Sequence, residues 1–299
     1  MSSGFRFVVT KRDTTKLEAY LLAIAVQMIL VPPLLLVMGV DPIHPSFFPV
    51  GAVVGGLLFG ASMSVAGGCA AGVWFKLGGG SLEAGAAVLG MIVGAASLEV
   101  GPLAFVRRTL HSVSVPSFEF DGALAAVSVV AGLVIAGLLM RAKVTMAGDW
   151  TWRRTGLLVG LTGVLAWPLS IAAGRPFGMA VIPGAVSLLS RPLGVNYAAS
   201  AWDLLFVVGV PLGGLLAVRG RAAFTAMPTL GAAARRFAGG LGLGLGASLA
   251  AGCTVGHGLT GLPLFAPGSA VTMLAIFAGS VAAPVAAAWR QKAKVSGRA

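Results

Sequence analysis

Apolar residues fill the chain in long blocks, and short polar stretches separate the blocks. Eight blocks are about as long as the 20 residues that a helix needs to cross a bilayer. A shorter apolar stretch, 177–190, predicts a re-entrant or interfacial helix. We therefore expect an all-α polytopic membrane protein, with helix ends good to about two to four residues. The predicted crossings are 17–39, 51–78, 82–106, 123–141, 155–173, 200–218, 235–262 and 268–289.

Composition supports a membrane protein. Hydrophobic residues make up 57% of the 299 positions and charged residues 10%, whereas a soluble domain carries about 25% charged residues. The formal charge of +12 would suggest nucleic acid in a soluble chain, but here we expect no nucleic-acid partner. The surrounding partner is the lipid bilayer, and the basic residues are read as orientation signals.

The distribution of Lys and Arg predicts the orientation. Seventeen of the 21 fall on one side of the predicted helices. Because basic loops stay inside, we expect a multi-pass protein of the bacterial inner membrane with both termini in the cytoplasm. The first 16 residues are polar and basic and contain no signal-peptide core. The four outer residues are Arg107, Arg108, Arg175 and Arg191.

The two cysteines occupy matching sequences. "SVAGGCAAG" contains Cys69 and "SLAAGCTVG" contains Cys253, 184 residues later. In the predicted topology the two segments cross in opposite directions, so we expect an inverted repeat, an architecture that many transporters share. The predicted division is a first repeat at 1–106, a linker region at 107–154 with one crossing at 123–141, and a second repeat at 155–299.

Glycines beside each cysteine predict a break in the helix. A short half-helix should then begin near Ala70 and near Thr254, and its N-terminal end favours an anion. A thiol there is a soft partner for a soft anion. The alternative is that both cysteines are small packing residues, but packing does not require that they be repeat-equivalent.

These motifs resemble the YeeE/YedE family of bacterial membrane proteins. The shared features are the doubled "GGCAAG" and "AGCTVG" breaks, the stretches "GAVVGGLLFGASMS" and "FAGGLGLGLGASL", and "GRPFGMA" at 174–180. The resemblance implies import of thiosulfate or a related sulfur anion, passed between paired cysteines by S–H hydrogen bonding. It also implies a small cytoplasmic sulfur-carrier protein as a possible partner.

Two features depart from the family. Its members carry a further cysteine near the N-terminus, where this chain has Arg6 in "SSGFRF". They also usually have a helix before that motif, so we expect either that the first repeat lacks its leading helix or that the true start of the chain lies upstream of Met1. The missing thiol weakens the case for thiosulfate, and the alternative substrates are other sulfur or selenium species.

Several other residues are candidates. His257 could serve as a proton or hydrogen-bond partner, or be structural. Arg175 could collect anions or simply sit at the membrane surface, and Asp203 is read as structural. We expect no metal, no cofactor and no catalytic residue. The predicted substrate pathway is Cys69, Cys253, Gly67, Gly68, Gly72, Gly252, Thr254, Gly256, His257 and Arg175.

Three functions compete on the sequence. The first is a transporter or channel for a sulfur-containing anion, thiosulfate first. The second is a membrane thiol oxidoreductase or sulfurtransferase, which needs a reactive thiolate; no CxxC motif is present. The third is a degenerate family member that does not transport.

Overall fold

The computed structural model describes residues 13–43, 47–116, 120–146, 149–218 and 225–296, with side chains described up to residue 283. Within this part of the chain it is helical and contains no β-strand, so the all-α prediction is confirmed. Arg6 and His44 lie outside the described residues. The elements are α2 (Thr15–Met38), α3 (Pro49–Ala66), α4 (Ala70–Gly78), α5 (Leu82–Glu99), α6 (Ala104–Leu110), α7 (Gly122–Met140), α8 (Trp152–Ala172), α9 (Ile182–Ser190), α10 (Ala201–Ala217), α11 (Leu230–Leu249), the π-helix η1 (Thr254–Gly261), the 3-10 turn η2 (Leu262–Leu264) and α12 (Pro267–Ser296).

Five of the described helical segments are long and apolar enough to cross a membrane: α2, α3 with α4, α5, α7 and α8. A sixth is formed if α11 and the segment Thr254–Leu264 (η1 and η2), which meet at an angle of 42°, are one bent span. The helix α10 and the described apolar part of α12, 267–283, are shorter. The membrane class is thus confirmed, while the count of eight crossings stays a prediction.

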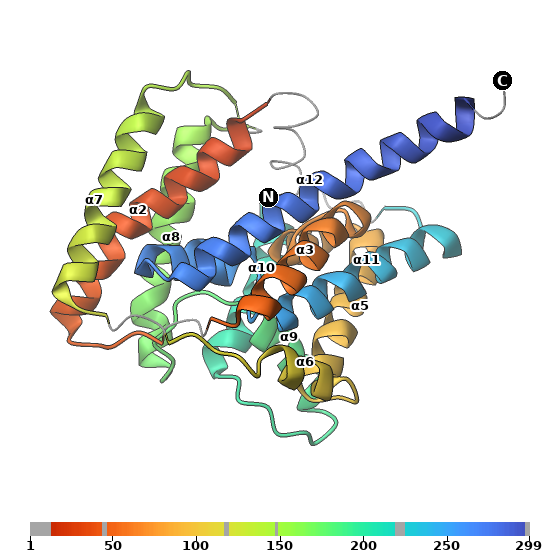
Figure 1. Cartoon of the computed structure of the whole chain (residues 1–299), viewed down its shortest axis with the longest axis horizontal. Coiled ribbons are helices and arrows are strands. Elements are labelled where there is room, and N and C mark those ends of the chain that lie inside the picture. Colours follow the sequence, from red (N-terminus) through yellow and green to blue (C-terminus); the bar gives the residue numbers. More distant parts are fainter. Residues whose placement is uncertain (1–12, 44–46, 117–119, 147–148, 219–224, 297–299) are drawn as a thin grey trace.

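The helices form two packed groups (Figure 1). In one group α2 packs against α7 and α8, and in the other α3, α5, α11 and α12 pack together. The short elements η1 and η2 contact α2 and α12, so they join the two groups. The predicted crossing 82–106 ends early, since α5 stops at Glu99, just before the Gly-Pro pair at 101–102. A residue that precedes proline disfavours helical backbone.

Glycines let the second group pack backbone to backbone. A Cβ added to Gly90 would overlap the carbonyl of Phe237, and one added to Gly240 would overlap the carbonyl of Ala87. This is the close approach that small residues spaced four apart allow in lipid. The pair Gly209 and Gly213 has the same spacing on α10, but an added Cβ there meets nothing within 4 Å. Spacing alone therefore does not identify a packed seam.

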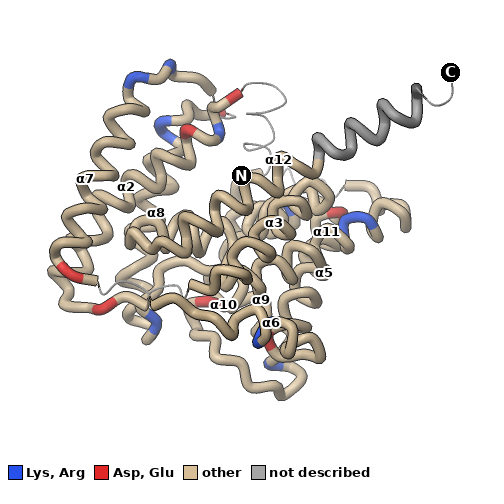
Figure 2. Tube along the Cα trace, viewed as in Figure 1, with Lys and Arg blue, Asp and Glu red and all other residues tan. Residues whose placement is uncertain are grey.

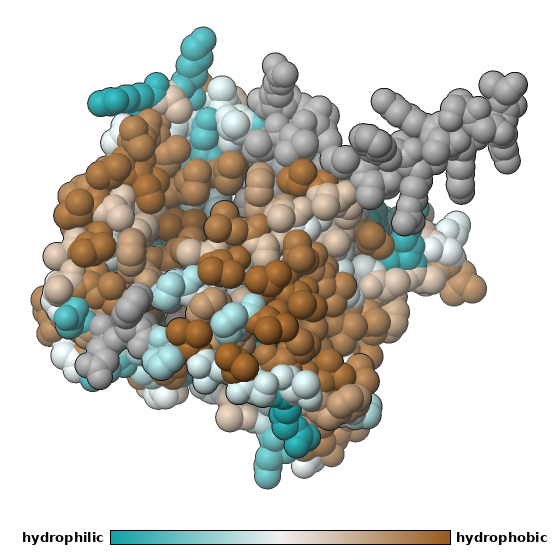
Figure 3. Space-filling model, in the orientation of Figure 1, coloured by the Kyte–Doolittle hydropathy of each residue, from teal (hydrophilic) through white to brown (hydrophobic). Residues whose placement is uncertain are grey.

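The surface is that of a protein surrounded by lipid. Charged residues gather toward the ends of the helices and are sparse along their lengths (Figure 2). Apolar side chains cover much of the visible face between these ends (Figure 3). On α7, Val130, Leu133 and Val134 are all more than half exposed. Exposed apolar area on this scale marks contact with membrane or partner.

A shift of 184 residues relates the elements of the two halves. It carries α2 onto α10, α3 onto α11, α4 onto η1 and α5 onto the start of α12. The helix contacts follow the same correspondence. The contact between α3 and α12 corresponds to the contact between α11 and α5, and the contact between α3 and α11 joins two equivalent helices. This correspondence is what an inverted repeat requires, and the division at 106 and 155 remains a prediction.

Candidate functional site

Cys253 is the residue directly before η1. Its backbone is extended, at φ −118° and ψ −173°, and its side chain is 1% exposed. The backbone N–H groups of Val255 and Gly256 point toward the sulfur from the first turn of η1, and that of Val181 does so from the loop before α9. Converging N–H groups at a helix N-terminus favour a negative charge. The break therefore brings three backbone N–H groups together beside the Cys253 sulfur.

Cys69 has the same place in the first half. It precedes α4 with extended backbone, at φ −78° and ψ 176°, and is 5% exposed. The predicted starts of the half-helices at Ala70 and Thr254 are confirmed. The hydroxyl of Tyr20 on α2 lies within electrostatic range of both thiols. The two cysteines share one buried cluster and are both free thiols.

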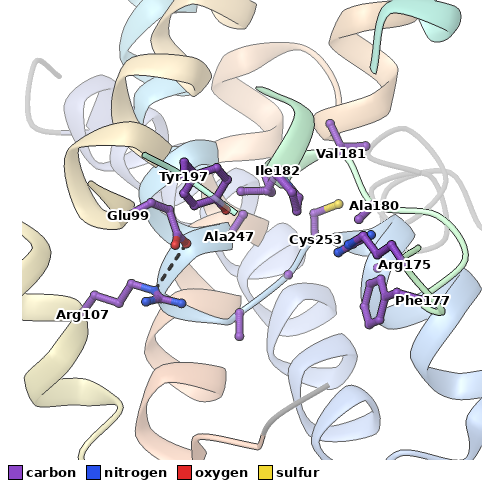
Figure 4. Close-up of a pocket in the computed structure, with 14 residues that line it drawn as sticks. Glu99, Arg107, Arg175, Phe177, Ala180, Val181, Ile182, Tyr197, Ala247 and Cys253 are labelled. Carbon is purple, nitrogen blue, oxygen red and sulfur yellow. Dashed lines mark ion pairs between the residues drawn. The ribbon is translucent and has the colours of Figure 1, made fainter. Parts of the chain in front are cut away.

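Cys253 lies at the wall of a cavity of about 150 Å³, which we call the Cys253 cavity. It is lined from α5, α6, the 175–183 segment, Tyr197 and the break before η1. Figure 4 shows the Cys253 sulfur on the side of Arg175 and Val181, with Tyr197 and Glu99 across from them. Thus a thiol, N–H groups and guanidinium groups face one space.

Two ion pairs border the Cys253 cavity. Arg175 Nη1 lies 2.7 Å from Oδ1 of Asp203, which is fully buried. Arg107 Nε lies 3.3 Å from Glu99 Oε1, a contact drawn in Figure 4. Each guanidinium is held by a carboxylate, so an entering anion has to share or displace that partner.

Arg175 and Tyr197, which both line the Cys253 cavity, lie outside the membrane spans and have shifted pKa values. Burial lowers the pKa of Arg175, although Asp203 opposes the shift. Burial also raises the pKa of the half-buried Tyr197 phenol above its ordinary value. Arginine is not deprotonated in proteins, so Arg175 is a cation, and the raised pKa keeps the Tyr197 phenol protonated and able to donate a hydrogen bond.

The "GRPFGMA" loop is clamped onto η1. Thr260 Oγ1 accepts from Met179 N at 3.1 Å and donates to Met179 O at 3.0 Å. Trp202 Nε1 donates to Gly178 O at 2.6 Å, and Gly178 has φ +72°. The guanidinium of Arg175 lies 4.7 Å from the centre of the Phe177 ring. These contacts fix Arg175 and the Val181 N–H beside Cys253.

Cys69 lines a second cavity, of about 280 Å³, which we call the Cys69 cavity. Its walls come from α2, the start of α4, α8 and η1. Lys16 is the basic residue of this lining, and most of the rest is apolar apart from hydroxyl groups. The lining is Lys16, Ala19, Tyr20, Cys69, Ala71, Thr155, Val159, Thr254, Val255 and Leu259.

The predicted pathway residues therefore divide into three sets. Four line the Cys253 cavity, namely Arg175, Gly252, Cys253 and Gly256. Two line the Cys69 cavity, Cys69 and Thr254. Of the other four, Gly67 lines a small pocket with Lys76 and Arg236, Gly68 and Gly72 pack near Val73 and Cys69, and His257 lines neither cavity.

His257 is held on both ring nitrogens. Nε2 lies 2.9 Å from Ala250 O and Nδ1 lies 3.0 Å from Ser269 Oγ, and the side chain is 2% exposed. A carbonyl only accepts, so Nε2 carries the proton and Nδ1 accepts from the serine. The half-helix that carries His257 is a π-helix, and the backbone N–H of His257 donates to the Cys253 carbonyl at 2.9 Å. These bonds tie the break to α12.

Sequence reasoning missed Glu99, Arg107, Tyr197 and Tyr20. Arg107 was assigned to orientation, and Glu99 ends a helix without any motif. Asp203 was read as structural, and indeed it caps α10 with Ser200; its ion pair with Arg175 depends on how the loop folds. Only the pairing of helix ends in space reveals these groups.

Broken apolar helices around two buried thiols define a helical membrane protein with one cavity beside each thiol. A family described as "Sulphur transport" matches residues 1–282, and the chain belongs to this family. It is 30% identical over 289 residues to a protein named thiosulfate transporter TsuA from Escherichia coli K12, covering 87% of this chain and 80% of that protein. A protein of the same name from Spirochaeta thermophila is 30% identical over 286 residues, covering 89% and 86%. A probable transporter from Xylella fastidiosa is 34% identical over 119 residues, covering 39% of this chain and 78% of its own.

Proposed function

We propose that this protein carries thiosulfate, or a closely similar sulfur anion, into the bacterial cell across the inner membrane. The anion passes from the Cys253 cavity to the Cys69 cavity and forms hydrogen bonds with the two thiols. It undergoes no covalent change. The membrane family and the two relatives named thiosulfate transporters support the substrate.

The observation that carries the proposal is the placement of the two cavities. Each repeat-equivalent cysteine lines a different cavity, and Tyr20 lies within electrostatic range of both thiols. The Cys253 cavity contains Arg107 and Arg175, which charge distribution assigns to the outside, and the Cys69 cavity contains Lys16, assigned to the inside. This arrangement supports entry past Cys253 and exit past Cys69, with both termini in the cytoplasm.

The chemistry of thiosulfate suits the path. Guanidinium groups attract the dianion from water, and the N–H groups beside Cys253 replace part of its hydration. The thiols donate to the terminal sulfur as soft partners. A small cytoplasmic sulfur-carrier protein that receives the anion is also proposed, on the family resemblance alone.

Uptake of radiolabelled thiosulfate into proteoliposomes tests the proposal. The wild-type protein should take up thiosulfate, and Cys253→Ala and Cys69→Ala should each lose most of it. Wild-type uptake in both variants would remove the thiols from the mechanism. Mass spectrometry of the protein after turnover should show unmodified cysteines, whereas a stable persulfide would indicate sulfur-transfer chemistry.

A further inference from the structure

The hydroxyl of Thr254 forms no hydrogen bond within the described part of the protein. Its side chain is 1% exposed, and Oγ1 is buried without a hydrogen-bond partner among the described residues. A buried hydroxyl without a partner is costly, and buried polar groups are nearly always paired. Thr254 also lines the Cys69 cavity. Its free hydroxyl therefore points to a ligand in that cavity.

The neighbouring groups differ in this respect. Thr155 lines the same cavity, but its Oγ1 donates to Thr151 O at 3.1 Å. The residue that corresponds to Thr254 in the first half is Ala70, which has no hydroxyl. The free hydroxyl is thus a feature of this one position and follows neither from the repeat nor from the composition of the cavity.

Tyr20 positions Thr254. Its hydroxyl donates to the backbone carbonyl of Thr254 at 2.6 Å. The same hydroxyl fills the space that a Cβ on Gly258 would need. This bond holds the first turn of η1 in place and does not engage the Thr254 hydroxyl.

We propose that Thr254 and Cys69 together form a second binding station that distinguishes sulfur oxyanions from sulfide. This inference rests on the proposed transport function. The Thr254 hydroxyl donates to an oxygen of the anion, and the Cys69 thiol donates to its terminal sulfur. Hydrosulfide has no oxygen for the hydroxyl to bind, so it gains nothing from Thr254. The guanidinium groups of Arg175 and Arg107 at the Cys253 cavity attract any anion, whereas this station binds an oxygen atom of the anion.

Titration of thiosulfate and of hydrosulfide against the purified full chain, together with uptake of labelled thiosulfate in proteoliposomes, tests the station. Hydrosulfide is followed by binding because neutral hydrogen sulfide crosses a bilayer without a protein. Thr254→Val keeps the shape of the side chain and should lower thiosulfate uptake about tenfold, the effect of losing one hydrogen bond to an anion. Thiosulfate affinity should fall by a similar factor and hydrosulfide affinity should stay within about twofold, so the ratio of the two affinities falls. Thr254→Ser should restore the ratio. The matched control Thr162→Val, whose hydroxyl donates to Leu158 O at 2.8 Å and which lines neither cavity, should leave it unchanged. Thr254→Ala, which carries the side chain found at the equivalent position 70, replaces Thr254→Val if the latter does not fold.

The outcomes separate the two claims. Equal losses for both anions, or unchanged thiosulfate uptake in Thr254→Val, would overturn the station while the wild-type protein still transports. A wild-type protein that takes up no sulfur anion would overturn the proposed function, and the station with it.

Discussion

Gly67 and Ala251 lie 184 residues apart and share a left-handed backbone. Their φ angles are +82° and +59°, and each stands two residues before its cysteine. Glycine adopts this conformation at no steric cost, whereas alanine does not. The two breaks therefore have the same local geometry, achieved with strain in one half and without strain in the other.

Replacing Ala251 with glycine should stabilise the protein. The left-handed conformation costs a non-glycine residue about 1–2 kcal/mol, and Ala251→Gly removes this cost less the entropy that glycine loses on folding. The reverse change, Gly67→Ala, should destabilise, because an added Cβ would also lie 2.8 Å from Arg236 Nη1. Thermal unfolding in detergent measures both. A lower unfolding temperature for Ala251→Gly would contradict the expected strain.

Asp203→Asn and Arg175→Ala should change thiosulfate affinity in opposite directions. Asp203 holds the Arg175 guanidinium at 2.7 Å. The neutral amide of Asp203→Asn competes less for this cation, so thiosulfate should bind several-fold more tightly. Loss of Arg175 should weaken binding, and it should also destabilise by about 3–5 kcal/mol because Asp203 remains buried without its partner. Titration of thiosulfate against each purified variant measures the affinity. Weaker binding in Asp203→Asn would show that the carboxylate does not compete with the anion.

The breaks were predictable from the sequence because they rest on local chemistry. Glycine runs beside a cysteine place the start of α4 at Ala70 and of η1 at Thr254, and helix N-termini attract anions in any fold. Arg175 was a candidate because it lies on the predicted outer side, directly before the short apolar stretch 177–190. Local pattern and charge were sufficient for these residues.

The rest of the site depends on where helix ends meet. Glu99 ends α5 and Arg107 follows on α6, and their pairing depends on how the chain turns after Glu99. Neither the π-helical form of η1 nor the bond from His257 to Ser269 has a sequence signature. Tertiary packing decides these features. The sequence alone therefore could not predict which partners Glu99, Arg107 and His257 would have.

Gly256→Ala should slow transport without affecting the fold. Gly256 lines the Cys253 cavity, and an added Cβ there meets nothing within 4 Å. The methyl group therefore extends into the cavity, and the N–H that faces Cys253 is retained. Thiosulfate uptake should fall several-fold with an unchanged unfolding temperature. Gly209→Ala on α10, also without contacts, is the control and should transport normally. Normal uptake by Gly256→Ala would place the route elsewhere.

Gly240→Ala should destabilise the packed group of α3, α5, α11 and α12. Its Cβ would overlap the Ala87 carbonyl, so α5 and α11 have to separate, at a cost of about 1–3 kcal/mol for overpacking. Gly213→Ala on α10 has the same chemistry but open space, and it should not destabilise because alanine favours helix over glycine. Comparing the two unfolding temperatures separates contact from helix propensity. Equal values would mean that the glycine seam does not set the distance between these helices.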